Sequence, residues 1–144
     1  MGAWGHKIFE DDSAFDWYDE FCNSNQSIKT IETVFDTVIA NDEYVDYDEG
    51  MAVFVACEIF AAAKGKPAEK FPDDAYHSFE DGAVPEIRFG ILRKGMTDEL
   101  LTKANTAAVK VRDHEKSELR ELWAESDEFD AWKENIAELL ERIS

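Results

Sequence analysis

An apolar run in the middle of the chain constrains the fold more than any other feature. Residues 51–63 read MAVFVACEIFAAA, and Gly65 and Pro67 follow shortly after. The run is apolar on nearly every side of a helix, and a helix without a polar face is a buried helix. Its thirteen residues, five of them alanine, exceed the usual length of a strand and lack strand propensity. We therefore expect a buried central helix over about 51–64.

Other segments have the three-four spacing of amphipathic helices. The sequence predicts helices over residues 12–22 with Asp11 or Asp12 as the cap, over 28–39 with Ser27 as the cap, from 97 with Thr97 as the cap, and to the end of the chain after Ser126 or Asp127. Whether one helix continues from 97 to 124 is left open. Residues 41–50 are expected to form a loop or cap.

Residues 66–95 give no regular pattern, because prolines and glycines interrupt every period. A short helix over 73–81 is the one element predicted there, and no strand or hairpin is expected anywhere in the chain. A length of 144 residues suits one domain. The prediction is therefore an all-α protein, with residues 1–144 forming a single compact bundle of five or six helices around the central helix.

The cysteines and the overall hydrophobicity indicate where the protein resides. Cys22 and Cys57 both fall in apolar parts of predicted helices, so we expect two buried thiols rather than a disulfide. The first residues resemble no secretion signal, and no window approaches 18 uninterrupted apolar residues. We expect a soluble, cytoplasmic protein.

Both ends of the sequence resemble one protein family. The opening MGAWG with IFEDDSAFDW, and the closing SELRELWAESDEFDAWKENIAELLERI, are similar to a bacterial family of unknown function whose members begin with the Met-Gly-Ala-Trp-Gly signature. The resemblance covers nearly the whole chain. It implies a small, mostly helical cytosolic protein, and it brings no catalytic residues with it.

The motifs of common enzyme classes are missing from the sequence. There is no glycine-rich phosphate loop, and His6, His77 and His114 are too far apart in sequence to form a metal-binding pair on one helix. The acids of residues 10–16 suit the first turn of a helix, and residues 42–50 lack the order of a calcium loop. We expect no catalytic residues, no bound metal and no cofactor, so the protein is predicted not to be an enzyme.

Negative charge is distributed unevenly along the chain. Residues 1–86 hold 20 of the 33 carboxylates against five lysines and no arginine, whereas residues 87–144 hold 13 carboxylates and ten basic residues. Concentrated charge opposes folding by self-repulsion, and its clearest use is to attract a partner of opposite charge. This favours a basic protein as the partner, and it disfavours nucleic acid and membrane surfaces.

Two acidic segments that also contain tyrosine are the candidate partner interface. Tyrosine supplies a rigid contact surface, and carboxylates steer and pair with Arg or Lys. Solvated loops without a function would explain the same composition. The candidate residues are Asp42, Glu43, Tyr44, Asp46, Tyr47, Asp48, Asp73, Asp74, Tyr76, Glu80 and Asp81.

The function that we expect from these features is binding of a basic protein. Its most concrete form is an immunity protein that neutralises a cationic bacterial toxin, for example a secreted or contact-delivered nuclease, by filling its basic active-site cleft. The alternatives are a self-assembling or adaptor protein without a toxin partner, and a carboxylate-dependent metal enzyme. The oligomeric state is left open.

Overall fold

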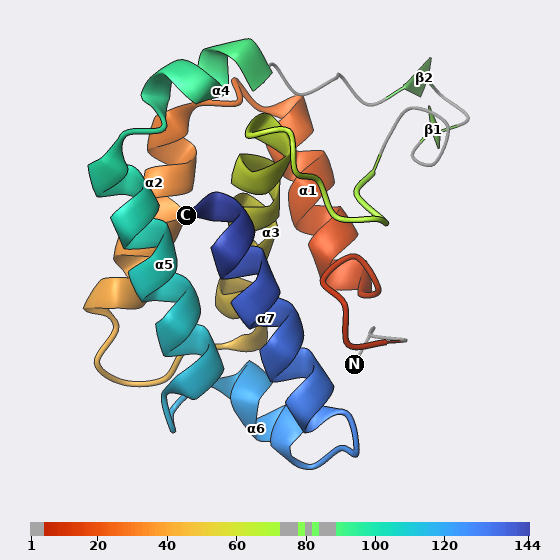
Figure 1. Cartoon of the computed structure of the whole chain (residues 1–144), viewed down its shortest axis with the longest axis vertical. Helices are drawn as coiled ribbons and strands as arrows, with labels where there is room; N and C mark the ends of the chain where they lie inside the picture. Colours follow the sequence, from red (N-terminus) through yellow and green to blue (C-terminus); the bar gives the residue numbers. More distant parts are fainter. Residues whose placement is uncertain (1–4, 73–77, 80–81, 84–88) are drawn as a thin grey trace.

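Helix α3 (Tyr47–Ala63) is enclosed by the other helices, as Figure 1 shows with α7 in front of it, α1 on one side and α2 and α5 on the other. The structure, a computed structural model, describes residues 5–72, 78–79, 82–83 and 89–144. Every residue of α3 from Gly50 to Ala63 is buried, and the helix contacts each of the six other helices in the described part of the chain. The expected helix at 51–64 is confirmed.

The remaining helices confirm the all-α prediction. They are α1 (Asp12–Asn23), α2 (Ile28–Ala40), α4 (Phe89–Gly95), α5 (Asp98–Asp113), α6 (Glu118–Ala124) and α7 (Phe129–Ile143). The described residues thus form seven helices, whereas the sequence predicted five or six. The difference arises because α4 was not expected and because the 97–124 segment divides into α5 and α6.

Side chains that cap helix ends define most of these boundaries. Asp11, Ser27 and Thr97 accept hydrogen bonds from backbone amides in the first turns of α1, α2 and α5, as predicted. Gly65, with a φ of 81°, follows α3, and the Gly65 and Lys66 amides donate back to carbonyls of its last turn. The sequence therefore carries its own start and stop signals for these four helices.

Helix α3 begins earlier than the sequence predicted. Asp46 accepts from the Glu49 amide at 2.8 Å, and the Glu49 carboxylate accepts from the Asp46 amide at 3.2 Å. This reciprocal capping box fixes the first turn, so Tyr47 to Gly50 are helical and the expected loop is confined to residues 41–46.

Ser117 separates α5 from α6. Its hydroxyl donates to the Val111 carbonyl at 2.6 Å, and the same oxygen accepts from the Arg120 amide at 3.4 Å. Ser117 is fully buried, so these bonds replace the solvent that its hydroxyl would otherwise need. The polar stretch after Asp113 is thus a turn between two helices.

The start of α7 differs from the prediction by one or two residues. Its cap position is Glu128, which makes no side-chain capping bond, and Ser126 instead accepts from the Glu128 amide at 3.2 Å. The serine stabilises the turn before the helix, so the predicted caps Ser126 and Asp127 are both wrong as cap positions.

A short ribbon corrects the expectation for residues 66–95. Strand β1 (Ser78–Phe79) pairs antiparallel with β2 (Gly82–Ala83), and Phe79 lies opposite Gly82. The predicted helix over 73–81 is therefore wrong at residues 78–79, and its other residues lie outside the described part of the chain. The expectation that the chain contains no strand or hairpin does not hold at these residues.

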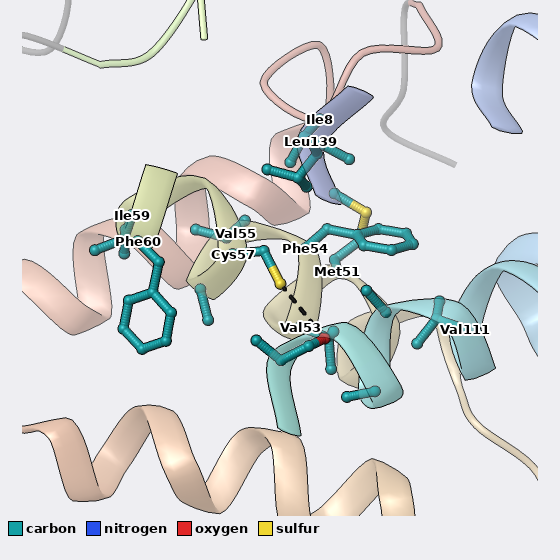
Figure 2. Packing of buried hydrophobic residues seen from close by; sticks show 14 of the residues in the cluster. Ile8, Met51, Val53, Phe54, Val55, Cys57, Ile59, Phe60, Val111 and Leu139 are labelled. Carbon is teal, nitrogen blue, oxygen red and sulfur yellow. Dashed lines mark hydrogen bonds between the residues drawn. The ribbon is translucent and has the colours of Figure 1, made fainter. Parts of the chain in front are cut away.

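Both cysteines are buried free thiols, as predicted. Figure 2 shows the thiol of Cys57 directed at the Ala104 carbonyl of α5, with a sulfur to oxygen distance of 3.8 Å. Helix α7 covers another side of α3, where the Trp132 ring packs edge-on against Phe54. No helix in the described residues combines the length and hydrophobicity that crossing a membrane would require.

Substitutions at two separate glycines test how closely α3 is packed. A Cβ atom on Gly50 would lie 2.7 Å from Leu119 Cδ1 and 3.0 Å from Val111 Cγ1, and both side chains are buried. Overpacking of this kind costs about 1–3 kcal/mol, which exceeds the gain of about 1 kcal/mol in helix propensity. We expect Gly50→Ala to lower the free energy of unfolding in urea by about 1 kcal/mol.

Gly90 is the matched control, because it lies in α4 and a Cβ there would meet no atom within 4 Å. Gly90→Ala should leave stability unchanged or raise it by up to about 1 kcal/mol. Equal effects of the two substitutions would contradict the close approach of α6 to α3.

Candidate functional site

Residues 41–48 are tied to the turn between α5 and α6. The Val45 amide donates to the Lys116 carbonyl, the Glu118 amide donates to the Val45 carbonyl, and both distances are 2.9 Å. Val45 itself is buried. We call the surface formed by residues 41–48 together with Glu118 and Glu121 the acidic junction. The two hydrogen bonds of Val45 hold the backbone of this loop against residues 116–118, which are distant in sequence. The side chains of the loop therefore project from a backbone of fixed position.

Lys110 joins the other end of this segment to α5. Its ammonium group donates to the carbonyls of Ile39 and Asn41 at 3.2 and 2.5 Å, where α2 ends. A cation at a helix C-terminus is favourable because the last carbonyls are unpaired. The Asn41 side chain also bonds the backbone of Glu43 and Tyr44. The loop is thus fastened at both of its ends.

Tyr44 is the exposed aromatic residue of the acidic junction. The residue is 44% exposed, and its hydroxyl donates to Glu121 Oε2 at 2.8 Å. That hydrogen bond raises the pKa of Tyr44 to about 12, because the neutral phenol is the form that can donate to the carboxylate. The ring is held in place by one carboxylate and remains exposed, and its role in an interface stays a prediction.

Tyr47 lies in a helix and not in the loop or cap expected over residues 41–50. It is the first residue of α3, packs partly buried against the core, and donates its hydroxyl to Asp11 Oδ2. Burial together with this bond raises the pKa of Tyr47. Its backbone amide is also bonded, to Glu118 Oε1 at 2.9 Å. Tyr47 therefore fastens α3 to α1 and α6, and packing accounts for its presence.

The acids of the segment divide into two kinds. Asp46 is committed to capping α3, as described above. Asp42, Glu43 and Asp48 are exposed, and their side chains make no hydrogen bond or ion pair within the described ranges of the chain. These three carboxylates, with Tyr44 between them and Glu121, are the part of the predicted interface that is free to meet a partner.

The second predicted segment cannot be placed beside the first. Asp73, Asp74, Tyr76, Glu80 and Asp81 lie outside the described residues. They stay predictions, and the acidic junction is defined without them.

Cations from the carboxyl-terminal part of the chain neutralise some acids of the amino-terminal part. Lys103 lies 3.1 Å from both Glu32 and Asp36, and Arg142 lies 2.8 Å from Glu58. The uneven charge of the sequence is therefore partly cancelled in three dimensions. What remains unpaired includes the exposed acids of the acidic junction.

Neither a metal-binding cluster nor a thiol with a lowered pKa is found among the described residues. No three His, Cys, Asp or Glu side chains among the described residues are placed to hold a metal ion. Burial raises the pKa of Cys22 to about 11 and also raises the pKa of Cys57, so both thiols are held in the protonated form.

One polar feature of the core was not expected from the sequence. Glu58, the single charged residue in the apolar run, is 2% exposed and forms two bonds with Arg142, at 2.8 and 3.2 Å. Burial raises the pKa of Glu58, and the paired guanidinium opposes that shift. The sequence signal for a buried ion pair was the single acid in the apolar run, because a buried charge requires a partner.

The comparisons with known proteins identify the family. A model described as "Domain of unknown function (DUF4259)" matches residues 2–135, so the chain belongs to this family. This confirms the expected family of unknown function and its extent. That its members are bacterial and share the opening signature stays a prediction. No curated protein and no solved structure matches the chain.

Titration of Tyr44 tests the geometry of the acidic junction. Tyrosine ordinarily titrates near pH 10, and the bond to Glu121 should hold Tyr44 neutral until about pH 12. Folding therefore gains a contribution that is present below pH 10 and lost as the pH rises towards 12. We expect Glu121→Gln to lower the pKa of Tyr44, as followed by its ring carbon resonance in NMR. An unchanged pKa would contradict the bond.

The buried ion pair gives a second prediction. Glu58→Leu leaves Arg142 without its buried partner, and breaking such a pair costs about 3–5 kcal/mol. Because Arg142 keeps its bond to Glu138 at 2.6 Å, we expect the lower end of that range in urea unfolding.

The double variant Glu58→Leu with Arg142→Leu is the control for the ion pair. It removes both charges, so it should recover most of the lost stability. A double variant that is less stable than Glu58→Leu alone would show that the pair is not what stabilises this part of the core.

Proposed function

We propose that the protein binds a basic protein partner through the acidic junction. The observation that carries the proposal is Tyr44, an exposed aromatic ring fixed by Glu121 and flanked by carboxylates with no internal partner. Aromatic anchors contribute much of the binding energy in protein interfaces, and surrounding charges determine which partner approaches. The two features occur here on one surface.

The fixed backbone of the acidic junction supports the proposal. A loop that is ordered only on binding loses conformational entropy, which weakens the complex. Here Val45 is bonded on both sides to the α5–α6 turn, and Lys110 holds the start of the loop. The loop that carries Tyr44 and the neighbouring acids therefore has a fixed conformation before a partner binds.

The negative charge of the acidic junction favours a cationic partner. Asp42, Glu43 and Asp48 are exposed, and they add to a formal net charge of −18 for the chain. Such a surface attracts Lys and Arg side chains and repels phosphate. In its most concrete form, the protein is an immunity protein whose acids fill the basic cleft of a nuclease toxin.

Charge reversal tests the proposal. We expect the protein, immobilised and exposed to lysate of its native cell at low salt, to retain a basic protein that elutes as salt is raised. Replacing Asp42, Glu43 and Asp48 together by Lys should reduce that retention at least about tenfold, because attraction becomes repulsion.

A control variant with the same change in charge distinguishes an effect of the acidic junction from an effect of the net charge of the chain. Glu125, Asp127 and Glu134 are exposed acids near α6 and on α7, so replacing all three by Lys alters the total charge equally. This control should retain the partner largely unchanged. If both triple variants lost retention of the partner equally, the net charge and not the acidic junction would account for binding. The proposal would then fail.

A further inference from the structure

Glu118 bonds the chain on both sides of Asp46, the residue that caps α3. Its backbone amide donates to the Val45 carbonyl at 2.9 Å, and its Oε1 atom accepts from the Tyr47 amide, also at 2.9 Å. Glu118 is the first residue of α6, and the nearby Lys116 carbonyl accepts from the Val45 amide. The start of α6 therefore brackets the cap of α3, at the point where the loop of the acidic junction becomes helical.

The Tyr47 amide needs the acceptor that Glu118 supplies. Tyr47 is the first residue of α3, and the amides of a first helical turn have no acceptor within their own helix. The side chain of Asp46 accepts from the Glu49 amide. The carboxylate of Glu118 thus completes the capping of α3 from a position 71 residues away in sequence.

The hydroxyl of Tyr47 is bound as well. It donates to Asp11, the buried residue that caps α1. Because both polar groups of Tyr47 are bonded to other helices, the first turn of α3 is held against α1 and α6 together. The loop that carries Tyr44 therefore enters α3 from a fixed position.

The negative charge of Glu118 is unfavourable at this place. The pKa of Tyr44 is raised first by its bond to Glu121, and the charge of Glu118 raises it further, so these carboxylates lie near one another around the phenol. Like charges that are gathered in this way repel. An acid at position 118 is therefore explained either by contact with a cationic partner or by the bonds through which it holds the loop.

Exposure and bonding distinguish these two roles. The exposed acids of the loop make no bond within the described ranges, so they suit direct contact with a partner. Glu118 is half-buried, and one of its oxygens is already bonded to Tyr47. We propose that Glu118 is a positioning residue of the acidic junction, which holds residues 44–47 in the conformation that a basic partner binds and does not itself contact that partner. The inference rests on the proposed function for the partner alone.

Two neutral variants separate position from charge. Glutamine keeps an oxygen that can accept from the Tyr47 amide, alanine does not, and both remove the negative charge. In the isolated protein, Glu118→Ala should speed hydrogen exchange of the Val45 amide at least about tenfold, and Glu118→Gln should leave it within about threefold of the wild type. The Cys57 amide, in the buried part of α3, is the internal reference for unfolding of the core and should not change.

Two results of the exchange experiment would overturn the proposal. If Val45 exchanged equally fast in both variants, the bond to Tyr47 would not be what holds the loop. If Glu118→Ala raised exchange at Val45 and Cys57 alike, Glu118 would support the whole fold and not the junction. Glu115, an exposed acid of the α5–α6 turn, is the matched control, and its alanine and glutamine variants should both exchange as the wild type does.

Retention of a basic protein from native-cell lysate at low salt gives the functional readout. Glu118→Ala should reduce retention at least about tenfold, whereas Glu118→Gln should retain the partner largely as the wild type does, because the conformation of the loop is kept. Equal loss in both variants would mean that the charge of Glu118 contacts the partner, which would overturn the positioning role. If the wild type retains no basic protein, the proposed function fails, and the exchange rates still decide whether Glu118 holds the loop.

Discussion

The burial of α3 on every side is the constraint on which the rest of the structure depends. A helix with no polar face gains stability only when other elements remove it from water, and here six helices share that task. The covering helices are therefore amphipathic, and their outer faces carry the charge of the chain. Close packing at Gly50 brings α6 against the start of α3, which places Glu118 and Glu121 beside residues 41–48. The acidic junction is thus a consequence of how the core is enclosed.

The same constraint explains the polar site inside the fold. Glu58 interrupts the apolar surface of α3, and its charge is tolerated because Arg142 reaches it from the last turns of α7. Arg142 also bonds the Lys66 carbonyl, so the ion pair connects the end of α7 to the segment that follows α3.

Local signals in the sequence predicted the helices well, and long-range partners could not be predicted. Asp11, Ser27 and Thr97 each lie next to the turn that they cap, so a short window reveals their role. Asp46 has the same local signal, with Glu49 three residues later, but its place in an acidic segment suggested an interface residue instead. Tyr47 and Glu58 are satisfied by Asp11 and Arg142, 36 and 84 residues away, and no local pattern specifies such pairings. Of the candidate interface, Tyr44 and the neighbouring acids are exposed, and their interface role stays a prediction, whereas Asp46 and Tyr47 have structural roles.

The central functional claim is that exposed carboxylates around a fixed tyrosine recruit a cationic protein. The most direct test is the rate of association with the salt-eluted partner, measured by stopped-flow over a range of ionic strength. Electrostatic steering predicts an association rate constant that falls steeply as salt rises, with a dissociation rate that changes little. An association rate that is independent of salt would contradict the account, because the charge of the acidic junction would then have no part in recognition.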